Sequence, residues 1–207
     1  MTHVFSSDPQ GAAALATALG AAHVVVDAGR EVFPIHGREV RADLWRKFAC
    51  IVPQARPFCA LTIGVIGPES CGKSTLVSEL AAHFDATVID DAIRRVARGG
   101  IPSSTDFLTV GREAPRHRRA ALERTETGIV IADTTVLGTR AWMQRLGMSS
   151  WDRLTAGVRD ERLDLWLLCH DDLASVCPPE HVDPSTSAPH FPRMLTWSRS
   201  KATVRLA

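Results

Sequence analysis

The sequence lacks features that would settle a class of function at once. None of its five cysteines, Cys50, Cys59, Cys71, Cys169 and Cys177, forms a Cys-x-x-Cys pair, so neither a zinc site nor a disulfide framework is indicated. It also lacks an excess of charge, since 24 Lys and Arg residues offset 23 Asp and Glu residues to leave a net charge of +1. Such a chain has no overall attraction to nucleic acid or to an anionic membrane. Partners must be inferred from local patterns.

Long apolar runs are missing too. The alanine-rich segment 12–22 is too short and too weakly apolar to span a bilayer. Residues 1–10 do not place a basic region before an apolar one, as a secretory signal does. An odd number of cysteines fits a reducing compartment. We therefore expect a cytoplasmic protein without a membrane partner.

One segment fits the phosphate-binding template of Gly, four residues, Gly, Lys and Ser or Thr: Gly67, Pro68, Glu69, Ser70, Cys71, Gly72, Lys73, Ser74 and Thr75. The apolar run 61–66 before it predicts a buried strand, and residues 73–84 follow with helical spacing. The alternative is a glycine turn that only joins a strand to a helix. We interpret the segment as a nucleotide site, because the template requires several residue types at once.

Each residue type in this segment has a chemical role. We expect Gly67 and Gly72 to adopt backbone angles closed to other residues, so that the N–H groups between them curl around an anion. The helix that begins near Lys73 adds its positive dipole end. Lys73 would reach the β- and γ-phosphates of ATP, and the Ser74 hydroxyl would hold Mg²⁺. Cys71 is either a small filler or a thiol whose pKa the helix N-terminus lowers.

Strand-like and helix-like segments alternate after residue 60, which predicts an α/β fold with a mainly parallel sheet and helices on both faces. A linker at residues 52–57 precedes this part, because two prolines favour extended backbone there. We expect a helix at 11–22, a strand at 23–26 and a helix at 38–50 before the linker. After it we expect strands at 61–66, 86–89, 128–132, 163–168 and 203–206, and helices at 73–84, 91–97, 105–111, 115–126, 135–146 and 150–159.

Acidic residues follow two of these strands, at the edge where parallel sheets bind ligands. Asp133 is expected to bind Mg²⁺ directly or through water, with helix capping as the alternative. Asp91 is either the base that accepts the proton of a substrate hydroxyl or a support for the first turn of a helix capped by Asp90. Arg94 or Arg95 would clamp a phosphate or a ribose, although a solvated position is the default for a single arginine.

Basic residues concentrate in one predicted helical region: Arg112, Arg116, His117, Arg118, Arg119 and Arg124. They could close over transferring phosphates or contact nucleic acid. No aromatic residue is interleaved with them, and Glu113, Glu123 and Glu126 lie in the same region. An exposed charged face is therefore favoured, and nucleic acid is not expected as a partner.

The phosphate-binding segment resembles that of the NadR-type ribosylnicotinamide kinase domain, a P-loop family in which Gly-x-Glu-Ser follows the first strand. Four further segments resemble motifs of that family in the same order: Asp91–Arg94, Thr105–Phe107, Ile131–Thr134 and Leu163–Asp171. The resemblance covers about residues 60–172. It implies a P-loop NTPase fold of three α/β/α layers, incomplete at the C-terminal end. It also implies ATP and Mg²⁺ as cofactors, and Lys73, Asp91 and Arg94 as catalytic residues.

The rest of the chain departs from that family. Residues 1–58 resemble the end of the adenylyltransferase domain of NadR proteins, with Ile35 and Arg41 matching its closing motif. The His-x-Gly-His motif is missing, so no adenylyl transfer is expected. The Arg-bearing lid is absent from residues 173–178. We expect an N-terminal remnant at 1–58, a kinase-like domain at 59–172 and an irregular or disordered tail at 173–207.

Three functions are consistent with these patterns. The leading one is a kinase that transfers the γ-phosphate of ATP to a nucleoside-like hydroxyl, with nicotinamide riboside as the substrate that the resemblance implies, in NAD metabolism. The second is a regulatory or degenerate module that binds nucleotide without turnover, because the lid is missing. The third is an ATPase coupled to a partner through the basic region.

Overall fold

The computed structural model describes residues 2–68, 71–97, 102–169 and 203–205, without the side chains of residues 94, 95, 97 and 203–205. The chain divides into two compact units, Met1–Lys47 and Phe48–Ala207. The division of the chain at residue 58 stays a prediction. None of the helices in the described residues has both the length and the apolar character needed to cross a bilayer.

The first unit is a strand, a helix and a second strand, followed by a short helix: β1 (His3–Ser6), α1 (Gly11–Ala18), β2 (Ala22–Val25) and α2 (Gly37–Ala42). β1 and β2 pair in parallel, and β1 was not predicted from the sequence. The predicted helix 38–50 is wrong in extent, since α2 stops early and a 3₁₀ turn, η1 (Phe48–Cys50), follows. Of the described apolar residues in this unit, Ala12 and Ala16 are the buried ones.

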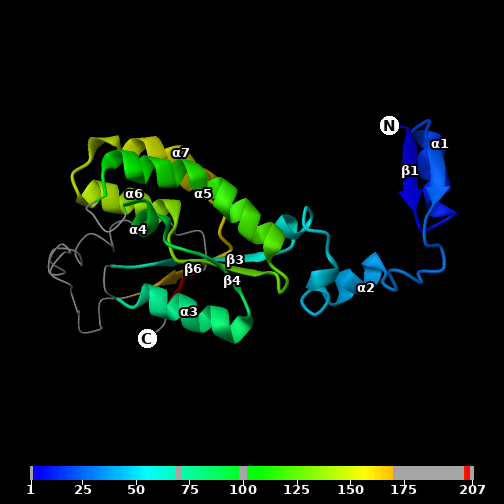
Figure 1. Ribbon diagram of the computed structural model, residues 1–207, viewed down its shortest axis with the longest axis horizontal. Helices are drawn as coiled ribbons and strands as arrows, with labels where there is room; N and C mark the ends of the chain where they lie inside the picture. The colour runs from blue at the N-terminus through cyan, green and yellow to red at the C-terminus, as the bar shows by residue number, and fades with distance from the viewer. Residues whose placement is uncertain (1, 69–70, 98–101, 170–202, 206–207) are drawn as a thin grey trace. The chain divides into compact units, whose positions relative to one another are not determined.

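The second unit is built on a parallel sheet in the order β4-β5-β3-β6-β7 (Figure 1). Its strands are β3 (Leu61–Ile66), β4 (Thr87–Ile89), β5 (Ile129–Ala132), β6 (Leu165–Leu168) and β7 (Thr203–Arg205). β3 lies between β5 and β6, and its apolar side chains are buried on both faces, as is typical of a central strand of a parallel sheet. The predicted strands are confirmed to within a few residues.

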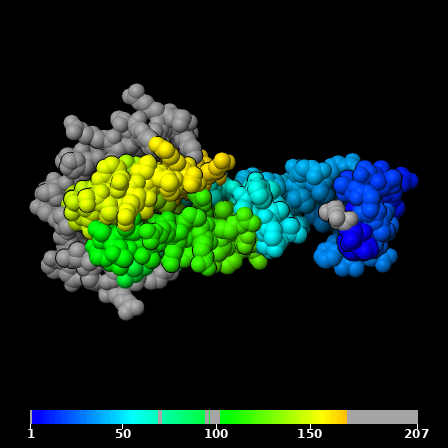
Figure 2. All heavy atoms as spheres, turned by 90° about the horizontal axis from the view of Figure 1, so that it is seen from above, coloured from blue at the N-terminus to red at the C-terminus, as the bar shows by residue number. Residues whose placement is uncertain are grey.

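Helices cover both faces of this sheet (Figure 1). α3 (Lys73–Phe84) lies on one face. The other face carries α4 (Ala92–Ala97), α5 (Ser104–Arg124), α6 (Val136–Arg145), the 3₁₀ helix η3 (Ser149–Leu154) and α7 (Thr155–Asp160). Figure 2 shows α5 in green beside the yellow segment that contains α6 and α7. The predicted three-layer P-loop NTPase fold is confirmed.

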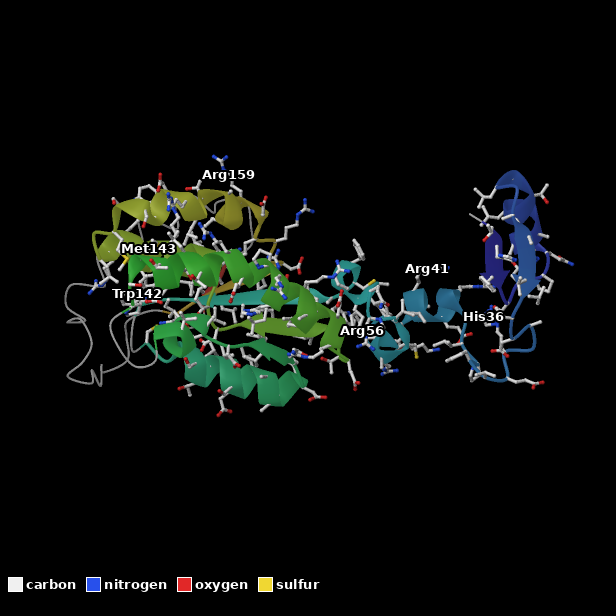
Figure 3. The ribbon with its side chains drawn as sticks, turned by 45° about the horizontal axis from the view of Figure 1, so that its top comes forward. His36, Arg41, Arg56, Trp142, Met143 and Arg159 are labelled. Atoms are coloured by element: carbon white, nitrogen blue, oxygen red, sulfur yellow. The ribbon has the colours of Figure 1, made fainter. Side chains whose placement is uncertain are left out.

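The side chains of β3 alternate between the two layers. Ile63 and Val65 pack with Val77 of α3. Ile66 belongs to a cluster on the opposite face, with Leu163 and Trp166. A further cluster joins α5, α6 and η3, and Met143 at its centre is fully buried beside the partly buried Trp142 (Figure 3). The first two clusters contain residues of β3 and hold the strand that leads into the phosphate-binding loop.

α5 is one continuous helix, which corrects the prediction of two helices separated near Pro115. A proline inside a helix removes one hydrogen bond and costs about 3 kcal/mol. The helix continues because its apolar face is buried and its start is fixed by a capping box, in which Ser103 and Asp106 exchange hydrogen bonds. Gly111 lies one turn before Pro115, where Leu154 fills the space that a side chain would need.

The register between β3 and β6 is fixed by a polar contact between Thr62, the second residue of β3, and Asp164, which immediately precedes β6. The Asp164 carboxylate accepts hydrogen bonds of 2.7 Å from both the backbone N–H and the hydroxyl of Thr62. The Asp164 N–H donates in return to the Thr62 carbonyl, at 2.9 Å. This register determines which residue follows β6 at the level of the phosphate-binding loop.

Arg56 holds the segment before β3 against the end of α5 (Figure 3). Its guanidinium donates to the carbonyls of Ile51 at 2.9 Å and Ala49 at 3.3 Å on its own segment. It also donates to the carbonyls of Glu123 and Arg124 in the last turn of α5, at 3.1 Å and 3.4 Å. Those carbonyls have no partner within the helix, so Arg56 satisfies the C-terminal end of α5.

Candidate functional site

The phosphate-binding loop lies between β3 and α3, at the carboxyl end of the central strand. Glu69 and Ser70 lie outside the described residues. Gly72 has φ of +79°, the left-handed conformation that the sequence predicted for it. Gly67 does not have a positive φ, so the predicted reason for a glycine at this position is wrong. A side chain there is excluded by space, since a Cβ would lie 2.7 Å from the Cys169 carbonyl oxygen.

Lys73 begins α3 and its side chain runs back along the loop. Its ammonium donates a hydrogen bond to the Pro68 carbonyl and lies 3.8 Å from the Cys71 sulfur. The first backbone bond that closes a turn of α3 runs from Leu76 N–H to the Gly72 carbonyl. The N–H groups that precede it lie at the open, positive end of the helix, where an anion is stabilised. Thr75 is exposed on the first turn.

Ser74 and Asp133 meet at the end of the sheet, as the sequence predicted. The Ser74 hydroxyl donates to a carboxylate oxygen of Asp133 at 2.8 Å. Asp133 is held at the carboxyl end of β5 by a bond from its N–H to the Ile89 carbonyl of β4, at 3.0 Å. A hydroxyl and a carboxylate oxygen are ligands that Mg²⁺ accepts, usually together with water and substrate phosphates. The pair fits that ion, while Thr135 rather than Asp133 caps α6.

The position of Asp91 is compatible with both roles considered for it, the support of a helix turn and the acceptance of a substrate proton. Its carboxylate accepts a hydrogen bond from the Ile93 N–H at 3.1 Å, which supports the first turn of α4. It also follows β4 directly, at the same edge of the sheet as the phosphate-binding loop. Asp90 is exposed. The side chain of Arg94 lies outside the described part of the structure, so its predicted role is untested.

The basic region on α5 is partly used within the unit. Arg118 donates to the carbonyls of Asp160 and Arg162, at 3.3 Å and 3.5 Å. Arg119 pairs with Glu123 one turn later on α5. Arg112, Arg116 and Arg124 remain on the charged face that the sequence favoured. Because Arg118 and Arg119 have partners within the unit, fewer basic side chains of α5 are available to a partner than its sequence suggested.

A cavity of about 180 Å³ adjoins the ends of β4 and β5 and was not predicted from the sequence. Its wall includes Asp90 and Thr134 at the strand ends, and His117 and Arg118 from α5. The cavity therefore brings together Asp90, which the sequence assigned to a helix cap, and His117 and Arg118, which it assigned to a basic surface. Only the packing of α5 over the sheet brings them together, so no local pattern could have identified it.

Cys71 has a neighbour that sequence analysis also missed. Cys169 follows β6, and a hydrogen bond from its thiol lowers the pKa of the Cys71 thiol to about 6, with the Lys73 ammonium and N–H also favouring the thiolate. In the thiol form, Cys71 donates to the Pro68 carbonyl at 3.0 Å. Of the two alternatives offered for Cys71, the buried position fits a small filler, while the direction of the pKa fits the activated thiol, with the second cysteine rather than the helix N-terminus as the main cause.

In the described residues, no three His, Cys, Asp or Glu side chains gather as a metal site.

A family comparison matches residues 62–187 to the family described as an AAA domain. The chain belongs to the AAA domain family. The matched residues include the phosphate-binding loop, the Ser74–Asp133 pair, strands β4, β5 and β6, and all of β3 except Leu61.

Curated relatives of this AAA domain include the trifunctional NAD biosynthesis/regulator protein NadR of Escherichia coli (strain K12), which is 34% identical over 84 residues. The same identity and length are found with the NadR protein of Salmonella typhimurium. Each match covers 41% of this chain and 20% of the relative. The chain thus matches about a fifth of the length of these relatives.

Among solved structures, a NadR protein in complex with NR superposes with a TM-score of 0.70 and 18% identity, over 99% of this chain and 60% of that one. A deoxyadenosine kinase from M. mycoides superposes with a TM-score of 0.53 and 12% identity, over 71% of this chain and 90% of that one. These similarities show the fold that the AAA domain shares with both proteins.

Proposed function

We propose that this protein is an ATP-dependent kinase that transfers the γ-phosphate of ATP to a hydroxyl group of a nucleoside-like substrate. The observation that carries the proposal is the Ser74–Asp133 hydrogen bond of 2.8 Å beside the Lys73 loop. It unites a phosphate-binding element with a pair of oxygen ligands for Mg²⁺. The similarity to the NadR proteins supports nicotinamide riboside as the substrate and NAD metabolism as the setting.

The nucleotide would be held by residues of the loop and of α3. Lys73 and the backbone N–H groups of residues 67–75 would bind the phosphates, and Ser74 with Asp133 would hold Mg²⁺. When bound, Mg²⁺ neutralises the charge of the phosphate oxygens. Lys73 would keep an ammonium beside those oxygens, and its bond to the Pro68 carbonyl orients it in advance.

The acceptor would occupy the cavity between α5 and the sheet, with Asp91 and Arg94 at its hydroxyl. Asp91 lies in the chain between Asp90 and Ala92, which both line the cavity, and we propose that it accepts the proton of the attacking hydroxyl. Two acidic residues, Asp90 and Asp160, line the cavity. A positively charged base such as the pyridinium of nicotinamide riboside would be attracted to them.

The proposal is tested by incubating the purified protein with magnesium, ATP and nicotinamide riboside and measuring the mononucleotide product. Removal of one preorganised donor from such a site reduces turnover by about 10²–10³-fold, which is the loss expected for Lys73→Ala. Lys47→Ala is the matched control, because Lys47 lies in the first unit and pairs with Glu39 at 3.0 Å. A wild-type rate no higher than that of Lys73→Ala would contradict the kinase assignment.

A second function is favoured by the sequence that follows β6, where the Arg-bearing lid of the resembling family is not found. The protein would then bind ATP as a regulatory or degenerate module without turnover. Calorimetry separates the two functions: this one requires ATP binding that Lys73→Ala removes, with no product from any nucleoside.

A further inference from the structure

Two cysteines from distant parts of the chain border one small space beside the phosphate-binding loop. Cys71 belongs to the loop and is 6% exposed. Cys169 follows β6 and is fixed there by a hydrogen bond of 2.8 Å from its N–H to the Ile66 carbonyl of β3. A Cβ placed on Gly67 would lie 2.8 Å from the Cys71 sulfur and 2.9 Å from the Cys169 Cβ. The absent side chain of Gly67 is what lets the two cysteines approach each other.

The protonation states of the pair differ. The hydrogen bond from Cys169 lowers the pKa of Cys71, and the adjacent Lys73 ammonium acts in the same direction. The same contact raises the pKa of Cys169, and the nearby Asp133 carboxylate contributes to that rise. Near neutral pH the pair therefore consists of a thiolate in the loop and a thiol at the end of β6. A thiolate beside a second, protonated cysteine is the arrangement of a reactive and a resolving residue.

We propose that Cys71 and Cys169 are a modification site, at which a hydroperoxide reversibly forms a disulfide that ties the phosphate-binding loop to the end of β6 and weakens nucleotide binding. The functional half of this proposal rests on the proposed nucleotide site. The chemical half, disulfide formation, stands on the juxtaposition of the two side chains across Gly67.

The chemistry balances in two steps. The Cys71 thiolate attacks one oxygen of the hydroperoxide, the O–O bond breaks, and the departing alkoxide or hydroxide takes up a proton to leave an alcohol or water. Cys71 is then a sulfenic acid. The Cys169 sulfur attacks that sulfur, the S–O bond breaks and water leaves with the proton of Cys169. The two cysteines lose two electrons, and the hydroperoxide gains them.

The disulfide changes the loop because the two sulfurs must approach to about 2.05 Å. Cys71 would be drawn toward β6 over Gly67, and its backbone N–H would move with it. The Cys71 sulfur lies 3.8 Å from the Lys73 ammonium. In the disulfide this sulfur carries no negative charge, so it would no longer attract the ammonium to its present position. Displacements of about 1 Å in a positioned site can cost about 10²-fold. We expect a loss of that size in affinity for ATP.

The other cysteines provide the controls. Cys50 is exposed and Cys59 is half-buried, and both precede β3 in the chain. Cys177 lies outside the described residues. Peptide mapping is therefore needed to identify which sulfurs are joined. Cys169→Ser removes the resolving sulfur and lies outside the proposed ATP contacts, while Cys59→Ser is the matched cysteine-to-serine change away from the loop.

The experiment compares the reduced full chain with the chain treated with hydrogen peroxide. In the wild type we expect a peptide that links Cys71 to Cys169, an approximately 100-fold weaker affinity for ATP by calorimetry, and recovery of both with dithiothreitol. Cys59→Ser should behave as the wild type. In Cys169→Ser no linked peptide should form, and dimedone should label Cys71 as a sulfenic acid.

Two outcomes would overturn the proposal: no peptide that links Cys71 to Cys169 at any peroxide concentration, or a complete link with unchanged affinity for ATP. Failure of the proposed function looks different, because reduced wild-type protein would then not bind ATP at all. The peptide map would still decide in that case whether the two cysteines form a disulfide.

Discussion

The surroundings of Cys71 strongly favour its thiolate form. The hydrogen bond from Cys169 lowers its pKa from 9.0 to about 6, and the charge of Lys73 adds to this effect. A thiol whose pKa is lower in the folded than in the unfolded protein stabilises the folded protein fully above the unfolded value. That stabilisation is lost as the pH falls from about 9 to about 6.

We therefore predict that the free energy of unfolding of the wild type, relative to that of Cys169→Ala, increases as the pH rises from about 6 to about 9. Alanine cannot donate the hydrogen bond that stabilises the Cys71 thiolate. Urea denaturation of the reduced proteins across this pH range measures the difference. Cys59→Ala is the control and should show no such trend. A difference that is constant with pH would contradict the assigned cause of the pKa shift.

Other residues show what a sequence pattern can and cannot specify about the site. The meeting of Ser74 and Asp133 could be expected from the sequence, because the phosphate-binding template and the end of an apolar strand each define a position at the same edge of a parallel sheet. Their binding of Mg²⁺ stays a prediction. Cys169 was missed because its place beside Gly67 depends on the register of β6 against β3. That register is set by Thr62 and Asp164, which are 102 residues apart.

Among the elements, α5 depends on contacts at both of its ends. Its first turn is closed by the Ser103–Asp106 capping box, and its last carbonyls accept hydrogen bonds from Arg56. The sequence predicted a break at Pro115 because proline usually ends a helix. The burial of the apolar face of α5 and the hydrogen bonds at its two ends outweigh the local preference of Pro115. These are tertiary contacts, which a residue propensity does not include.

Arg56→Ala should reduce the free energy of unfolding by about 1.5–3 kcal/mol, because hydrogen bonds from a charged donor to the end of α5 are lost. Arg56→Lys should recover only part of this, since an ammonium cannot reach carbonyls on both segments as a planar guanidinium does. Urea denaturation provides the measurement. Arg46→Ala is the matched control, because its side chain is 87% exposed. Equal stability of Arg56→Ala and Arg46→Ala would refute this role.

At the scale of the whole molecule, the two units differ in how much they bury. The second unit encloses several apolar clusters around a five-stranded sheet. The first unit pairs two strands and leaves Phe5, Val32 and Phe33 at 66%, 70% and 71% exposure. Two-stranded sheets are marginally stable in water by themselves. The units should therefore open with different free energies.

Hydrogen exchange followed by mass spectrometry tests this difference. Amides of β1, α1 and β2 should exchange far faster than those of β3 and β5, since local stability follows buried apolar contacts. Addition of magnesium and ATP should slow exchange in residues 61–84 and leave residues 2–47 unchanged, and Lys73→Ala should remove that effect. Equal protection of β1 and β3 without nucleotide would show that the first unit is stabilised by something beyond its own contacts.

The central position of β3 has a consequence for synthesis of the chain. β3 is made early, but its partners β5 and β6 follow about 65 and 100 residues later in the chain. At about 5–20 residues per second, the ribosome needs about 5–20 s to add 100 residues. Before β5 is made, the apolar run 61–66 has no strand to pair with, and until β6 is made one of its edges stays unpaired. Nascent chains should therefore require chaperone protection at this stage, and β3 is paired on both of its sides only after β6 has been made.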